Sequence, residues 1–302
     1  MSANKRILLP IDVTHPHPEY LTQLNELISL SGTAVHILYV HEELPAMEHI
    51  LRTLAHSADE LDARVKSEAT NVIEQFGAAA ETLGATVTHE IVGGPAAMMI
   101  ETVAKDENFA LTGLTPGRKP GVDKYLLGRV SSKVVRHAPG TVLLMRGDAQ
   151  AKITNVVIGL DGSEESVNAL RQAVLLFDLV GKGAKVTLVN VVSVHPIFTM
   201  ISTVESAAAI ETNLKMSGDV LLAQGEEILS ELGLKNYEMK LKEGNPADGL
   251  LEAATECGAS LVVAGSQGKG AVEHFLMGST STRLANHAKC PVAIFKNKNG
   301  KR

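Results

Sequence analysis

The chain contains one unit written twice, with the two copies about 150 residues apart. The matching segments are 5–41 with 154–193, 93–96 with 244–247, 127–128 with 277–278, and 137–138 with 287–288. This repeat length is that of one small domain, so the pattern indicates a tandem duplication. We therefore expect two related domains, 1–148 and 149–302, joined by the short polar segment 147–152.

The composition is that of an ordinary soluble globular chain, with 45% hydrophobic and 21% charged residues among 302. A net charge of −6 and an aromatic content of 3% argue against a nucleic-acid partner, because neither a basic stripe nor a base-stacking platform is present. No apolar run is long enough to span a membrane, and we expect no signal peptide because residues 1–6 lead straight into the first strand. Cys257 and Cys290 fit no metal spacing, so we expect both to be reduced thiols. We accordingly expect a cytoplasmic protein, and one without a membrane partner.

Each copy alternates short apolar runs with segments of helical spacing. The expected strands are 7–11, 34–40, 86–92, 109–112 and 141–145 in the first copy, and 156–160, 185–192, 237–241, 260–264 and 292–295 in the second. The longest expected helices are 45–83 and 204–232. Strands that alternate with helices form parallel sheets through right-handed crossovers. The fold class expected is therefore α/β, with two tandem doubly wound domains of five parallel strands each.

A glycine-rich loop follows the fourth strand of the second copy. Gly265, Ser266 and Gly268 begin this loop, and Gly278-Ser279-Thr280 stands at the start of the last helix. Glycines let the backbone approach a ligand closely and turn successive N–H groups toward an anion. A helix start adds further N–H groups and a partial positive charge. The two segments together predict a site for a polyphosphate chain.

A carboxylate is expected opposite this loop. Asp161 ends the first strand of the second copy. Ligands of open α/β sheets collect beyond the carboxyl ends of the strands, where the chain direction reverses. In a sheet of strand order 3-2-1-4-5 the first and fourth strands are neighbours, so Asp161 would face the loop that begins at Gly265. Its carboxylate could accept hydrogen bonds from ribose hydroxyls or from an adenine amino group.

The spacing G-x2-G-x9-G-[ST] of Gly265, Gly268, Gly278 and Ser279, with the Asp161-Gly162-Ser163 turn, resembles the universal stress protein family. The resemblance extends over nearly the whole chain as two tandem copies. It implies a strand order of 3-2-1-4-5 and a site for ATP or AMP. It also implies that Asp161 and Val191 lie beside the adenosine, and that residues 265–268 and 278–280 hold the ribose and the phosphates. Final strands pair across the dimer interface in this family, which makes 141–145 and 292–295 candidates for the interface of an internal pseudo-dimer.

The first copy departs from the motif. It keeps Asp12 and Val40, but its loop runs from Gly113 to Gly117 with one extra residue between the glycines. Ten residues instead of nine then precede Gly128, and Arg129 replaces the hydroxyl residue. Pro116 also removes a backbone donor. Two readings stay open: a degenerate half that stabilises the pair, or an anion site built on the basic residues Arg118, Lys119, Lys124 and Arg129.

The function expected from these features is that of a nucleotide-dependent regulatory or interaction module in a stress response. The ligand would be ATP, AMP or ADP, and Mg²⁺ could accompany it. We also expect a homo-oligomer and a protein partner of unknown identity. One alternative is a weak ATPase, with Glu273 or His274 as a base. The other is a structural protein whose sites are relics. No catalytic residues and no metal ligands are assigned.

Overall fold

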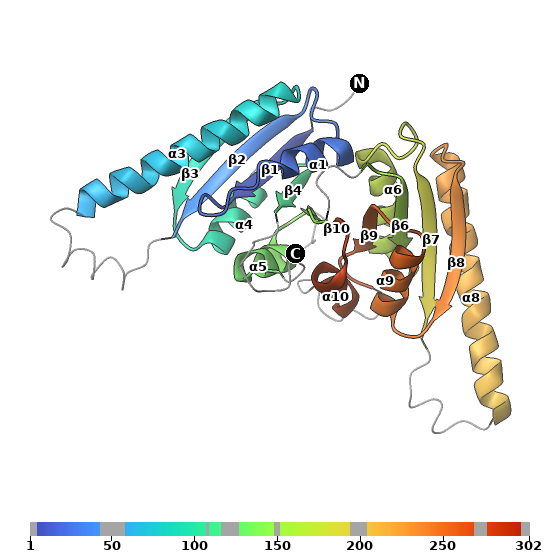
Figure 1. Ribbon diagram of the computed structural model, residues 1–302. Coiled ribbons are helices and arrows are strands. Elements are labelled where there is room, and N and C mark those ends of the chain that lie inside the picture. Colours follow the sequence, from blue (N-terminus) through green and yellow to red (C-terminus); the bar gives the residue numbers. More distant parts are fainter. Residues whose placement is uncertain are drawn as a thin grey trace. The chain divides into compact units, whose positions relative to one another are not determined.

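The computed structural model describes residues 5–42, 58–106, 109–115, 127–147, 152–193, 204–268 and 277–296 (Figure 1). It divides the chain into two compact units, Met1–Met145 and Arg146–Arg302. Within the described ranges no helix is long and apolar enough to cross a membrane.

The first unit is a parallel sheet with helices on both faces. Its elements are β1 (Arg6–Ile11), α1 (Tyr20–Leu27), β2 (Ala34–His41), α3 (Ala58–Thr82), β3 (Thr86–Gly93), α4 (Ala96–Asp106), β4 (Leu111–Leu114), α5 (Arg129–His137) and β5 (Thr141–Leu144). The strands follow the order β3-β2-β1-β4-β5. Helices α1 and α3 lie on one face, and α4 and α5 lie on the other (Figure 1).

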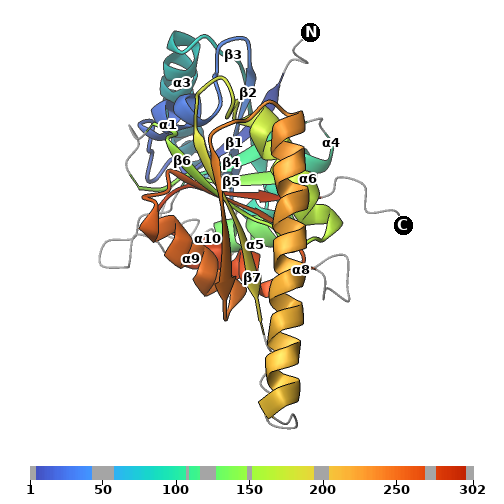
Figure 2. The ribbon, with the colours of Figure 1, turned by 90° about the vertical axis from the view of Figure 1, so that its right-hand side faces the viewer.

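The second unit repeats this plan. Its elements are β6 (Asn155–Gly159), α6 (Glu164–Leu176), β7 (Lys185–Val192), α8 (Val204–Glu231), β8 (Tyr237–Glu243), α9 (Pro246–Glu256), β9 (Leu261–Gly265), α10 (Ser279–His287) and β10 (Val292–Phe295). The strand order β8-β7-β6-β9-β10 is the 3-2-1-4-5 order again. Helices α6 and α8 cover one face, and α9 and α10 cover the other (Figure 2).

The inner residues of the central strands are apolar, as expected for strands covered on both faces. The three β6 residues Val156, Val157 and Ile158 have no exposed surface, and neither do Leu261, Val262 and Val263 of β9. Burial of these apolar side chains helps to drive the folding of the second unit. Asp161 follows β6 and Ser266 follows β9, so these polar residues stand at the carboxyl edge of the sheet.

The helices that start at this edge have well-defined N-termini. Ser163 caps α6, and its hydroxyl accepts a hydrogen bond from the Ser166 amide at 3.1 Å. Asn245 caps α9, with Pro246 in the first turn where its missing N–H costs nothing. In the first unit Gly94 occupies the place of Asn245, and the Glu42 carboxylate accepts from the Ala96 amide instead, at 3.0 Å.

The sequence prediction of two tandem α/β units is confirmed, with differences at several element ends. The fourth strand was expected to end at residue 112, but β4 continues to Leu114 because Gly113 and Leu114 pair with Leu143 and Leu144 of β5. Gly113 is therefore a strand residue, and its assignment to the loop was wrong. The described part of the long helix expected over 45–83 begins at Ala58, and residues 43–57 lie outside the described ranges.

Candidate functional site

The strand register of the second unit places the predicted residues at one edge of the sheet. Gly159 of β6 pairs with Val189 of β7, so Asp161 lies opposite Val191 when the register is continued by two residues. Ile158 pairs with Val263 of β9, and continuing this register by three residues brings Asp161 beside Ser266. The carboxyl ends of β6, β7 and β9 thus converge on Asp161, as expected for a ligand site in an open α/β sheet.

Asp161 is held in one orientation. The amide and the hydroxyl of Ser163 both donate to its Oδ1, at 2.9 Å and 2.6 Å. The other oxygen, Oδ2, faces the loop, and a Cβ added at Gly268 would lie only 2.5 Å from it. Gly162 makes the turn between Asp161 and Ser163 with a φ of 75°, a conformation that favours glycine. The half-buried carboxylate is therefore fixed against the glycine loop.

Gly265 was expected in the loop, but it is the last residue of β9 and pairs with Phe295, so the loop begins at Ser266. This end of β9 is packed tightly under helix α6. A Cβ at Gly265 would lie 3.0 Å from the carbonyl carbon of Glu165 and 3.1 Å from the Ser166 amide. Ser266 is almost fully buried, and its amide donates to the Phe295 carbonyl at 2.8 Å. This amide is already used within the protein, so Ser266 fixes the position of the loop. The backbone near Gly268 lies farther out, beside Asp161.

The first turn of α10 is bonded to the same loop. The Gly278 amide donates to the Ser266 carbonyl at 2.8 Å, and the Ser281 hydroxyl donates to the Gly265 carbonyl at 2.6 Å. Gly278 is the N-cap residue, and no side chain caps the helix. Ser279 is exposed and Thr280 half-buried. The helix start therefore presents N–H groups, two hydroxyls and a partial positive charge at the edge that holds Asp161.

Val191 lies on the face of the sheet covered by α9. A Cβ at Gly249 of α9 would lie 2.8 Å from the Val191 side chain, so the glycine allows helix and strand to approach closely. Its neighbour Asn190 is buried on the opposite side of the strand, and its Nδ2 donates to the Leu160 carbonyl at 2.7 Å. This bond ties the ends of β6 and β7 together below Asp161.

Three residues of this site were not predicted from the sequence. They are Ser166, Asn190 and Ser281, all buried polar side chains that hydrogen-bond to backbone atoms of the edge. A single Ser or Asn that belongs to no sequence motif gives no signal in the sequence. Only the arrangement of the strands and helices shows which backbone atoms these three side chains contact. Glu273 and His274, the two candidate bases, lie outside the described residues.

The first unit repeats the aspartate turn but surrounds it differently. The amide and hydroxyl of Thr14 donate to Oδ1 of Asp12 at 2.9 Å and 2.6 Å, as Ser163 does to Asp161. Here, however, Nδ1 of His15 lies 3.7 Å from Oδ2, and the Asp12 side chain is 52% exposed. Burial and, to a smaller extent, the Asp12 charge raise the pKa of Tyr39, which precedes the Val40 position.

The loop of the first unit is also different where it is described. Ile7 pairs with Leu111 in the first unit as Val156 pairs with Leu261 in the second, so the two leucines are equivalent. Four residues further on, Thr115 therefore stands where the second unit has Gly265. Gly128 caps α5 as Gly278 caps α10, with nearly the same dihedral angles, but the exposed Arg129 follows it. The predicted loop residues Pro116, Gly117, Arg118, Lys119 and Lys124 lie outside the described residues.

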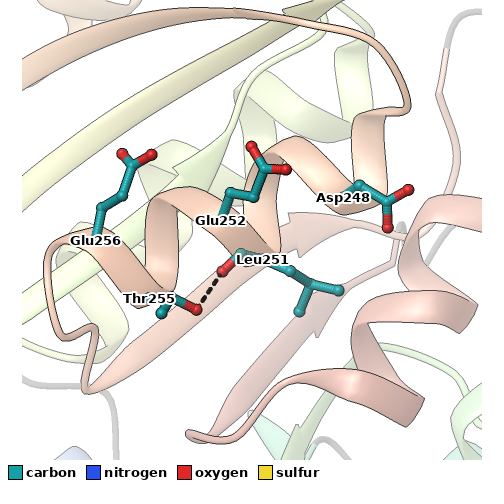
Figure 3. Close-up of a pocket in the computed structure, with 5 residues that line it drawn as sticks. All are labelled: Asp248, Leu251, Glu252, Thr255 and Glu256. Atoms are coloured by element: carbon teal, nitrogen blue, oxygen red, sulfur yellow. Dashed lines mark hydrogen bonds between the residues drawn. The ribbon is translucent and has the colours of Figure 1, made fainter.

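A separate shallow hollow lies along α9, lined by Asp248, Leu251, Glu252, Thr255 and Glu256 (Figure 3). Glu252 and Glu256 pair with Lys242 at 3.4 Å and 2.7 Å. The hydrogen bond from Lys242, and to a smaller extent that from Lys240, lowers the pKa of Glu256. The carboxylates Glu252 and Glu256 of this surface are thus paired with lysines. The five residues all belong to one helix, and none of the predicted site residues lines the hollow.

Comparison with known proteins identifies the fold and the family. A universal stress protein of Methanocaldococcus jannaschii is 34% identical over 144 residues, which is 47% of this chain and 81% of that protein. The crystal structure of a universal stress protein from Archaeoglobus fulgidus covers 98% of this chain and 99% of its own, with a TM-score of 0.64 at 20% identity, and so shares the fold. The model of the universal stress protein family matches residues 3–146 and again 152–296. The chain therefore belongs to the universal stress protein family, as a member with two tandem domains.

Proposed function

We propose that the second unit binds an adenine nucleotide at the carboxyl ends of β6 and β9, and that the bound state regulates the protein's association with partners. The observation that carries this proposal is the convergence of Asp161, the Gly268 loop and the start of α10, which no side chain caps, on one edge. ATP, ADP and AMP are all candidates, and the first unit is proposed to support the second without an equivalent site.

The start of α10 suits the phosphates. Amides of the first helical turn have no intrahelical partner, and the helix dipole favours negative charge there. Gly278 brings no side chain that would compete for these donors. The hydroxyls of Ser279 and Thr280 can donate to phosphate oxygens from the same turn. A polyphosphate chain would thus meet amides and hydroxyls together.

Asp161 suits the sugar. A fixed carboxylate repels phosphate but accepts hydrogen bonds from neutral hydroxyls. Two donors from Ser163 occupy Oδ1, and Oδ2 is turned toward the loop. This difference in charge sets the direction of the ligand, with the ribose at Asp161 and the phosphates at α10. Among the described residues no group of three His, Cys, Asp or Glu side chains could hold a metal ion.

The test is calorimetric titration with ATP, ADP and AMP, with and without Mg²⁺. Gly278→Asp puts a carboxylate among the phosphate donors and should abolish binding. Gly128→Asp makes the same change at the equivalent cap of the first unit and should leave binding unchanged. Gly278 and Gly128 have φ angles of −62° and −65°, which an L-residue adopts without strain, and Asp is a good N-cap. A Cβ at Gly278 would lie 3.3 Å from the Ser266 carbonyl oxygen, a close contact, whereas one at Gly128 meets nothing within 4 Å.

The proposal expects one nucleotide per chain for the unmodified protein and for Gly128→Asp. Loss of binding in Gly128→Asp together with retained binding in Gly278→Asp would place the site in the other unit. A protein that binds none of the three nucleotides at millimolar concentration would favour a structural role.

A further inference from the structure

Arg283 stands one turn from the proposed phosphate site. It belongs to the second turn of α10, with Ser279 and Thr280 four and three residues before it. Side chains of an α-helix lean toward its N-terminus and cover the preceding turn on the same face. Arg283 therefore shares a face of the helix with the two hydroxyl residues at its start, and 49% of its side chain is exposed.

The guanidinium of Arg283 is bonded to helix α9. Its Nη2 lies 2.7 Å from Oδ1 of Asp248, a residue in the first turn of that helix. Figure 3 shows the Asp248 carboxylate directed away from those of Glu252 and Glu256, which pair with Lys242 of β8. Helices α9 and α10 pack side by side, and both follow strands at their carboxyl ends. The Arg283–Asp248 pair thus lies at the edge of the sheet where both helices begin.

This ion pair is easily exchanged for a stronger one. Asp248 is 44% exposed, and ion pairs between exposed side chains contribute little because water screens them. A guanidinium binds a phosphate through two charge-assisted hydrogen bonds in a geometry that matches its planar fork. A phosphate near the start of α10 would therefore compete with Asp248 for Arg283.

We propose that Arg283 is a specificity residue that contacts the outer phosphates of the nucleotide, and that Asp248 restrains it when those phosphates are missing. The inference rests on the proposed function. Arg283 lies beyond the first turn, so it reaches the β- or γ-phosphate of a chain that extends along the helix and not the α-phosphate next to the ribose. ATP gains this contact and AMP does not. The first unit has Lys133 and Ala97 at the corresponding positions, so it lacks the restraining carboxylate.

The test compares ATP with AMP in two variants that break the same ion pair. Arg283→Gln should lower the affinity for ATP about tenfold and leave that for AMP unchanged, because one charge-assisted phosphate contact is lost. Asp248→Asn frees Arg283 and should raise the ATP affinity about threefold, again with AMP unchanged. Arg171→Gln breaks a comparable exposed pair, with Glu231 at 3.0 Å between α6 and α8, and should change neither affinity.

The opposite signs separate a ligand contact from a structural tie. If the pair only joined α9 to α10, both variants would lower the melting temperature and the ratio of ATP to AMP affinity would stay that of the unmodified chain. An unchanged ratio of ATP to AMP affinity in both variants would overturn the inference and leave the proposed function intact. A change of the ATP affinity in the same direction in both variants would do the same. Failure of the unmodified chain to bind either nucleotide would overturn the proposed function, and this inference with it.

Discussion

Oδ2 of Asp161 and the backbone of Gly268 are so close that a Cβ at position 268 would lie 2.5 Å from this oxygen. The contact joins the end of β6 to the loop after β9, the two segments that the proposed nucleotide site requires. Glycine at 268 is thus explained by the aspartate itself. The same aspartate turn in the first unit has His15 near its second oxygen.

Gly268→Ala should weaken nucleotide binding about tenfold, because the new methyl group displaces the carboxylate that receives the ribose. Gly128→Ala is the matched control, since a Cβ there meets nothing within 4 Å. Calorimetric titration with ATP measures both. Equal affinity in Gly268→Ala and the unmodified chain would show that Asp161 does not contact the ligand.

Ser163→Ala should lose about 1 kcal/mol of folding free energy together with nucleotide affinity. The hydroxyl of Ser163 caps α6 and also holds Asp161. Thr14→Ala removes the equivalent hydrogen bond in the first unit, from the Thr14 hydroxyl to Asp12. Because α1 starts only at Tyr20, Thr14 caps no helix, so neither stability through helix capping nor nucleotide binding should change. Urea denaturation and ATP titration of the two variants give the comparison. An affinity loss in Thr14→Ala would contradict the assignment of the site to the second unit.

Two helical glycines should respond to alanine with opposite signs. A Cβ at Gly225 of α8 would lie 2.8 Å from methyl groups of both Leu160 and Leu188, which are buried. Gly225→Ala should therefore destabilise the protein by about 1 kcal/mol through overpacking. Gly77 of α3 has only an ordinary contact with Val87 at 3.6 Å, so Gly77→Ala should stabilise by about 0.5–1 kcal/mol. Scanning calorimetry would refute this packing if both variants melted at a lower temperature.

Cys290 should be a slow thiol in the folded protein. Burial raises its pKa to about 11, although the Arg146 charge opposes the shift. Since the thiolate is the reactive form, alkylation at pH 8 should be about 10²-fold slower than for an ordinary cysteine, and faster as the pH approaches 11. The test measures the rate of iodoacetamide labelling in the Cys257→Ser variant, in which Cys290 is the remaining thiol. The rate in the folded protein is compared with the rate for the same variant unfolded in urea. Equal rates in the two conditions would show that Cys290 is accessible.

The fold followed from the sequence because its signals are local and repeated. Apolar runs of four to eight residues alternate with helical spacing in both copies, and each copy corroborates the other. The error at Gly113 has a physical cause: glycine usually marks the end of a strand, whereas here the pairing with Leu143 carries β4 past it. Only the register between strands revealed this.

The candidate site was only partly predictable. Asp161, Gly268 and Gly278 belong to a motif with fixed spacing, so the sequence alone singles them out. Asn190 and Ser281 act through bonds to Leu160 and Gly265, which lie 30 and 16 residues away in sequence. Such bonds depend on which strands are neighbours. The Arg283–Asp248 pair depends likewise on the packing of α10 against α9.

A crystal structure of the protein grown with saturating ATP would test the central claim most directly. The account predicts one nucleotide in the second unit, with its ribose at Asp161 and its phosphates against the amides and hydroxyls at the start of α10. A nucleotide bound only in the first unit, or phosphates placed away from residues 278–280, would contradict it.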